Sequence, residues 1–292
     1  MCVPGVRVAY LCRLALSVRI AVMTKSSARE KEPAIRPIGS YGVFLPYVII
    51  PFRFKSAQVL FRFLRTVVRD FFWLQFSVKW RFRSIPVLDV SHPLDDLIPF
   101  TPGKVQIYLN FTNFWIRPMT LLFRRLGVKK ALPYCIEYLS LIETAYANAA
   151  KVYRFCMTTT KRPDYKTDAA FKMIHAFDPH LLCVPSLHVA IVILSSVYYA
   201  DVFKNDDFTE EERKTYTAEL REGARRIIES VLYVKQHSVN CIPAAMYMML
   251  YVLKNRFTIS AGIDIINSLF ADDETLSDSD KKKISAHIHF MF

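Results

Sequence analysis

The chain has 292 residues, 52% of them hydrophobic and 14% aromatic, and its formal net charge is +13 at pH 7. Its six cysteines are scattered and form no CxxC pair, which argues against a zinc-binding framework and against a disulfide scaffold. The basic residues are interleaved with helix-long apolar runs, so they favour contact with anionic lipid and argue against a nucleic-acid partner.

Residues 1–40 are expected to form a basic N-terminal segment followed by a polar linker. Residues 1–23 alternate apolar side chains with three arginines and lack the unbroken apolar core of a secretory signal. They are either a basic amphipathic segment that lies on a membrane or residues ahead of a true start at Met23. The sequence does not choose between the two.

Residues 41–88 are expected to form amphipathic or interfacial helices. Residues 41–54 are apolar, but the segment is short and contains two prolines, so it is not expected to cross a bilayer. The helix-length run that follows places Arg62, Arg65 and Arg69 on one helical face. This stripe favours a helix that lies on a membrane surface, although an ordinary helix with a solvated face would show the same stripe.

Residues 89–256 are expected to form the core of the protein, and residues 257–292 a polar C-terminal tail. The core contains several apolar segments, which are typical of membrane-embedded helices. These segments are 105–123, 131–153, 181–203, 227–237 and 238–253. The predicted fold is therefore all-α: a polytopic membrane helical bundle of about five to six membrane-embedded helices, preceded by amphipathic helices.

The charged loops predict an orientation for such a bundle. Short loops rich in Lys and Arg tend to stay cytoplasmic, and residues 124–130 form a loop of this kind. Alternation of the segments then places Arg162, His188 and His237 on the opposite face. The predicted location is integral to a plasma or bacterial inner membrane, with the candidate site on the extracytoplasmic side.

The proline-rich segment 89–104 contains the pair Asp95-Asp96. Two adjacent carboxylates can bind a metal ion, but such a pair more often begins a helix or solvates a loop. We favour the second interpretation, and no metal or other cofactor is predicted.

The side chains that suggest chemistry lie at the ends of the apolar runs. Arg162 offers a planar fork that matches phosphate oxygens, and Lys161 adds positive charge beside it. Ser186 offers a hydroxyl group close to the start of an apolar helix, where free backbone N–H groups bind anions. His188 and His237 can serve as nucleophile and general acid. Phosphate-ester cleavage is the chemistry that this set of residues favours.

The same residues resemble the motifs of the type 2 phosphatidic acid phosphatase superfamily of membrane proteins. That family carries a Lys-x6-Arg-Pro motif, a Pro-Ser-Gly-His motif and a Ser-Arg-x5-His-x3-Asp motif. In the same order, this chain has Arg162-Pro163, Pro185-Ser186-Leu187-His188, and Ser230 seven residues before His237. Leu187 in place of Gly, and the stretch DDLIPF, resemble the branch of lipid phosphotransferases that includes inositol phosphorylceramide synthase. The resemblance covers roughly residues 89–253.

The resemblance implies a role for each matching residue. His237 would be the nucleophile that forms a phospho-histidine, and His188 the general acid for the leaving alkoxide. Arg162 and Ser186 would hold the phosphate, with Lys235 as an additional cation. The implied protein is a metal-independent membrane phosphatase or phosphotransferase, and the implied substrate is a lipid phosphate or a polyprenyl phosphate. The sequence gives no indication of the oligomeric state.

Three positions depart from the motifs. Phe155 stands where the family has Lys, Val231 where it has Arg, and Cys241 where it has the Asp that orients the nucleophilic histidine. These departures keep a second function open, in which a catalytically impaired member binds anionic lipid or a membrane partner on the same scaffold. In a third interpretation, the protein binds a membrane surface and its histidines are incidental.

Overall fold

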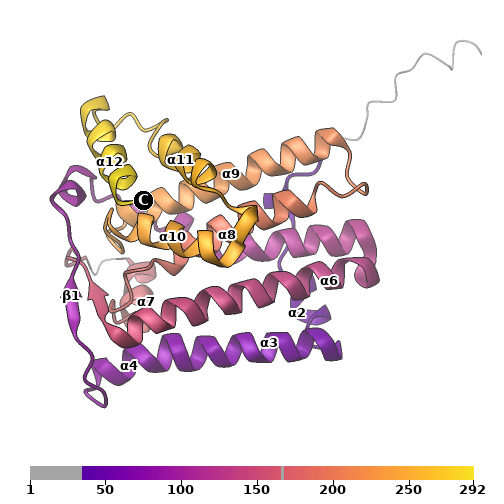
Figure 1. The fold of residues 1–292 in the computed structure, drawn as a ribbon, viewed down its shortest axis with the longest axis horizontal. Coiled ribbons are helices and arrows are strands. Elements are labelled where there is room, and N and C mark those ends of the chain that lie inside the picture. Colours follow the sequence, from indigo (N-terminus) through magenta and orange to yellow (C-terminus); the bar gives the residue numbers. More distant parts are fainter. Residues whose placement is uncertain (1–34, 166–167) are drawn as a thin grey trace, which may run out of the picture. The chain divides into compact units, whose positions relative to one another are not determined.

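The computed structural model describes residues 35–165 and 168–292, and residues 37–292 form one compact unit. The predicted basic segment 1–23 lies outside the described residues. The described part of the chain is mostly helical, as Figure 1 shows, and it contains one small two-stranded sheet. The predicted fold, a helical bundle embedded in a membrane, is contradicted, and only its mostly helical character agrees with the structure.

The elements follow one another along the chain in two groups. The N-terminal group comprises η2 (Ile38–Ser40), α2 (Phe44–Ile49), α3 (Phe54–Thr66), the π-helical η3 (Val67–Trp73), α4 (Leu74–Lys79), β1 (Val87–Asp89), η4 (Pro93–Leu97), η5 (Pro102–Lys104), α5 (Val105–Leu109) and α6 (Phe111–Phe155). The C-terminal group comprises β2 (Met157–Thr159), α7 (Ala169–Phe177), α8 (Leu187–Val202), α9 (Glu210–Tyr233), α10 (Cys241–Leu253), η6 (Lys254–Arg256), α11 (Ile259–Ser268) and α12 (Asp278–Met291).

Helix α8 is the centre of the core. It packs against α6, α9 and α10 (Figure 1), and nearly every residue from Leu187 to Val202 is buried by these neighbours. A helix that is apolar on all sides is expected wherever it is fully surrounded, either by lipid or by protein. Here protein side chains supply the surroundings, because Tyr138 and Tyr199 stack with ring centroids 4.7 Å apart.

Helix α6 is a hairpin of two helical segments, 111–126 and 128–155. Gly127 breaks the helix with φ of 72°, a backbone conformation that favours glycine. Trp115 and Tyr138 have ring centroids 6.1 Å apart, although an unbroken helix would separate them by about 35 Å along its axis. The turn that the sequence predicts around Gly127 is therefore confirmed.

The predicted polytopic membrane bundle is wrong. In the part of the chain that the structure describes, no helix combines the length and the apolar character needed to cross a membrane. Of the two most apolar helices, α8 has 16 residues and α10 has 13, whereas a spanning helix needs roughly 20. The prediction of an integral membrane protein with an extracytoplasmic site rested on such spans, and this finding contradicts it.

The small sheet joins two distant parts of the chain beside the N-terminal end of α8. Strands β1 and β2 pair in parallel, with Val87 opposite Met157 and Asp89 opposite Thr159. An isolated bridge pairs Thr158 with Leu182, so the segment that leads into α8 lies along β2. This arrangement brings residues 87–90, 157–160 and 180–186 together at one end of the helices.

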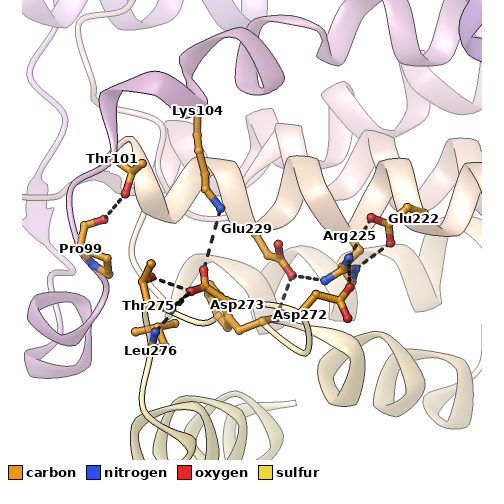
Figure 2. Close-up of polar contacts among 11 residues, drawn as sticks. Pro99, Thr101, Lys104, Glu222, Arg225, Glu229, Asp272, Asp273, Thr275 and Leu276 are labelled. Carbon is orange, nitrogen blue, oxygen red and sulfur yellow. Dashed lines mark hydrogen bonds and ion pairs between the residues drawn. The ribbon is translucent and has the colours of Figure 1, made fainter.

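The predicted polar tail contains two further helices, α11 and α12, and its connecting turn is bound to α9. Glu229 accepts a hydrogen bond from the Phe270 backbone N–H at 2.7 Å. It accepts another from Arg225 at 3.1 Å, as Figure 2 shows. Arg225 also reaches Asp272 at 2.7 Å, and Lys104 lies 3.9 Å from Asp273. These contacts fix the start of the 270–276 turn against the helix that leads to His237.

Candidate functional site

His237 is buried in the turn between α9 and α10, and both of its ring nitrogens have partners. Nδ1 lies 3.1 Å from the backbone carbonyl oxygen of Cys183, and Nε2 lies 3.2 Å from the Ser186 hydroxyl oxygen. A carbonyl oxygen only accepts hydrogen bonds, so Nδ1 carries the proton in the neutral ring. The Nε2 lone pair therefore faces Ser186.

Ser186 is the N-cap of α8. Its hydroxyl oxygen accepts a hydrogen bond from the Val189 backbone N–H at 3.4 Å, and the side chain is fully buried. The cap residue fixes the helix start directly beside His237. The partial positive charge of a helix N-terminus favours an anion at this place.

His188 lies on the first turn of α8, close to His237. The two rings have centroids 5.7 Å apart and meet at 64°. The other side of the His188 ring stacks on Tyr108, with centroids 4.5 Å apart, and contacts Phe111 at 4.6 Å. The structure thus brings the two predicted histidines and the predicted serine into one cluster, while their catalytic roles remain predictions.

Two cavities meet at His237. The first has a volume of about 400 Å³ and is mainly apolar, with Phe71, Tyr108, Ile174 and His188 in its wall. The second has a volume of about 550 Å³ and is polar. Its wall contains His237 and the three predicted cations, Lys161, Arg162 and Lys235. It also contains the acidic residues Asp95 and Asp96. His237 contributes to both walls, so a ligand bound beside it would have an apolar end and a polar end.

Two of the three cations of the polar cavity, Arg162 and Lys235, are already engaged by the protein. Arg162 pairs with the Asp178 carboxylate at 2.8 Å and donates to the Asp178 carbonyl oxygen at 3.2 Å, and its buried Nε has no partner. Lys235 donates to the backbone carbonyl oxygens of Asp95 and Ile98. Lys235 therefore anchors the loop that carries η4 at the cavity wall, in addition to placing positive charge there.

Burial sets the charge state of the histidines. Burial lowers the pKa of His188 to about 4. Burial and the nearby His188 hold the pKa of His237 well below its usual value. Both rings are thus neutral at neutral pH, which suits His237 as a nucleophile. A bound phosphate would raise the pKa of His188, because a nearby negative charge favours the protonated ring.

Asp95 has a structural role. Its carboxylate accepts hydrogen bonds from the backbone N–H groups of His92 and Val239, both at 2.8 Å, and it forms a capping box at the start of η4. The interpretation of the Asp95-Asp96 pair as a helix start is confirmed. Across residues 35–165 and 168–292, the structure contains no group of three or more His, Cys, Asp or Glu side chains arranged to hold a metal ion.

The motif departures have structural explanations. Cys241 is buried and its sulfur accepts the Ser238 backbone N–H at 3.3 Å, so it does not orient His237. The Cys183 carbonyl oxygen takes the place of the missing acid at Nδ1. Arg154, next to the Phe155 that replaces the motif lysine, pairs with Asp70 on η3.

Sequence reasoning missed two residues of the site. Asp178 holds Arg162, and His180 is buried with its Nε2 2.7 Å from the Thr160 hydroxyl oxygen. Burial and the positive charge of Arg162 lower the pKa of His180 to about 4. The signal was the Asp178-Pro179-His180 triplet directly ahead of the apolar run, where polar residues meet the start of a helix.

Comparison of the chain with models of protein families, with curated proteins and with solved structures gave no match in any of the three. The resemblance to the type 2 phosphatidic acid phosphatases thus stays a prediction from the motifs.

Proposed function

We propose that this protein transfers the phosphoryl group of an amphiphilic phosphate ester to water or to an alcohol, with His237 as the nucleophile. The observation that carries this proposal is the position of His237 between an apolar cavity and a cation-lined cavity, with its Nδ1 held by the Cys183 carbonyl oxygen. The apolar cavity fits the hydrophobic part of the substrate. The polar cavity and the N-terminus of α8 fit its phosphate.

The reaction has two steps. First, the Nε2 lone pair of His237 attacks phosphorus and the bond from phosphorus to the ester oxygen breaks. In the complex, where the bound phosphate favours the protonated ring, His188 takes up a proton from solvent. It gives this proton to the leaving oxygen, which departs as an alcohol, or as a monophosphate ester where the substrate is a diphosphate. Second, water or another alcohol attacks the phosphoryl group, gives its proton to His188, and the Nε2–phosphorus bond breaks. The product is inorganic phosphate or a new phosphate ester, and both histidines return to their starting states.

Ser186 and Arg162 have supporting roles in this mechanism. The Ser186 hydroxyl lies 3.2 Å from Nε2 and can donate to a phosphate oxygen during the attack. Arg162 places a positive charge in the polar cavity, where Asp178 fixes its position. The Cys183 carbonyl oxygen is neutral, so it stabilises the phosphorylated ring less than a carboxylate would. We therefore expect slow turnover.

The test is release of inorganic phosphate by the purified full chain from phosphatidic acid and from a polyprenyl diphosphate in mixed micelles, without added metal. We expect His237→Ala to lower turnover by about 10³-fold or more. We expect His188→Ala to lower it by about 10² to 10⁴-fold, the usual contribution of a general acid. His289→Ala is the matched control, because His289 is half-buried on α12, lines neither cavity, and its ring bonds the Asn267 side chain.

Absence of turnover on both substrates would contradict the proposal. If lipid-phosphate binding persists in that case and is lost in Arg162→Ala, the second predicted function, a non-catalytic binder of anionic lipid, is favoured. Turnover that survives His237→Ala would also contradict the role of this residue.

A further inference from the structure

The helical run from α3 through α4 carries its apolar side chains on the outside. The exposed apolar side chains recur at helical spacing, and the last of them is Trp73. We name this set the outer face. Its members are Phe54, Phe61, Leu64, Val68, Phe72 and Trp73. Phe54 is 78% exposed and Phe61 is 68% exposed. Figure 1 shows α3 and α4 at the edge of the helical unit, and α3 packs on α6.

The inward side of the same run is unusually polar. Five of its seven buried residues are polar: Ser56, Thr66, Asp70, Gln75 and Ser77, beside the apolar Phe63 and Leu74. The Ser56 hydroxyl donates to the Ile50 carbonyl oxygen and the Ser77 hydroxyl to the Leu74 carbonyl oxygen, both at 2.7 Å. A helix packed on a protein core normally has the reverse distribution, with apolar residues inward. Packing within the described chain therefore does not explain why the side chains of the outer face are apolar.

The charge around the outer face is strongly positive. Residues 44–88 contain eight Lys and Arg residues and a single acidic residue, Asp70. Asp70 is buried and pairs with Arg69 and Arg154, so it does not offset the exposed charge. Arg62 and Arg65 are exposed directly next to Phe61 and Leu64 along the helix. This combination complements a surface that has anionic groups above an apolar layer.

The outer face also continues into the apolar cavity. Phe72 is 38% exposed and contributes to the cavity wall next to Phe71. On the α7 side, Met173 and Phe177 are in the wall and are exposed as well. The cavity mouth is thus bordered by apolar side chains that reach the surface.

We propose that the outer face docks on an anionic lipid bilayer, with α3 lying in the plane of the headgroups and its aromatic side chains inserted at the boundary of the acyl layer. The exposed Trp73 and Trp80 suit this depth, since Trp prefers the membrane–water interface. Docking needs no helix that crosses the bilayer. Docking does not depend on the chemistry at His237, whereas entry of a bilayer lipid into the apolar cavity rests on the proposed function.

The test is flotation of the full chain with phosphatidylcholine vesicles that either contain or lack phosphatidylglycerol. We expect co-flotation with the anionic vesicles and a decrease as salt is raised. The triple substitution Phe61→Ser, Leu64→Ser, Val68→Ser should weaken binding by about tenfold or more, because it removes inserted apolar area. The double substitution Arg62→Gln, Arg65→Gln should weaken binding to anionic vesicles and leave the little binding to neutral vesicles unchanged.

The matched control is Tyr247→Ser with Tyr251→Ser on α10, which removes apolar side chains that are 69% and 71% exposed but lie outside the outer face. This variant should bind as the wild type does. Circular dichroism shows whether each variant is folded, and the exposed positions make loss of the fold unexpected.

Three results would overturn the proposal. One is absence of wild-type binding to anionic vesicles. Another is binding that the triple substitution leaves intact. The third is self-association of the wild type, seen as a dimer mass in light scattering that the triple substitution abolishes, because a second copy would then be the partner. His237→Ala should float as the wild type does, so failure of docking and failure of the proposed chemistry are separable.

Discussion

At the scale of single residues, the orientation of His237 is the central feature. The sequence leaves this histidine without the acid of the related motif, because Cys241 occupies that position. The fold supplies the Cys183 carbonyl oxygen in its place, at 3.1 Å from Nδ1. A backbone acceptor fixes the tautomer as well as a side chain would, but it adds no negative charge. The proposed nucleophile is therefore held in one orientation, with weaker electrostatic support than a carboxylate would give.

The buried histidines predict how stability depends on pH. The folded-state pKa of His180 is about 4, below the ordinary value of 6.5, so the unfolded chain binds more protons between these values. The free energy of unfolding should then fall as pH drops from about 6.5 towards 4, by about 2 kcal/mol for this group between pH 6.5 and 5. His188 and His237 shift in the same direction and add to the loss.

Urea denaturation at pH 7.5, 6.5 and 5 measures this effect. His180→Asn should flatten the pH dependence by close to one proton. Burial raises the pKa of the Glu229 carboxyl group, so this residue makes the protein more stable as pH falls. The pH dependence of each variant is therefore compared with that of the wild type. Stability that stays constant or rises from pH 7.5 to 5 would contradict the folded-state pKa values.

The sequence could predict some of these residues and not others. Ser186, His188 and His237 follow the spacing of a motif, and the structure brings them together. Asp178 and His180 belong to no motif, and their place depends on the bridge between Thr158 and Leu182. A contact that a long-range pairing creates leaves no local pattern in the chain, so these two residues were missed.

At the scale of elements, the sequence indicates where the apolar segments lie. It does not indicate whether lipid or protein surrounds them. The break at Gly127 and the helical character of 131–153 follow from local pattern, whereas the helix expected over 181–203 begins only at Leu187. Whether lipid or protein surrounds an apolar helix depends on its neighbours, and the neighbours of α8 are α6, α9 and α10. The hydrophobicity of α8 is therefore equally compatible with a membrane-spanning helix and with a helix buried in a protein core. The length of α8 in the structure, 16 residues, is too short for a membrane-spanning helix and favours a place in the protein core.

The prediction at this scale concerns the contact of α9 with the 270–276 turn in Figure 2. Glu229→Ala removes the acceptor of the Phe270 N–H and a partner of Arg225. We expect a loss of about 2 to 3 kcal/mol in the free energy of unfolding, because a buried donor loses a charged acceptor. Chemical denaturation at neutral pH measures the loss.

The matched control is Glu222→Ala. Glu222 pairs with the same Arg225 at 2.8 Å, but its side chain is 50% exposed, so its removal should cost about 1 kcal/mol or less. Equal losses in the two variants would show that burial of Glu229 contributes nothing, and would contradict the importance of this contact.

At the scale of the whole molecule, segments far apart in sequence build the two cavities around His237. The polar cavity takes residues from the η4 loop, from the segment after β2 and from the turn after α9. The apolar cavity takes residues from η3, α5, α7 and α8. The sequence indicated the polar cavity through its basic residues. It gave no sign of the apolar half, because Phe71, Tyr108 and Ile174 come from three separate elements.

The measurement that tests the central claim most directly is trapping of the phosphorylated protein. The full chain is mixed with phosphatidic acid radiolabelled in its phosphate group and quenched in alkali, which preserves phospho-histidine. We predict label on the peptide that contains His237, stable in alkali, lost in acid and absent from His237→Ala. Ser186 lies 3.2 Å from the same nitrogen and is the competing nucleophile. Acid-stable label on Ser186, or turnover without any labelled protein, would contradict the assignment of His237 as the nucleophile.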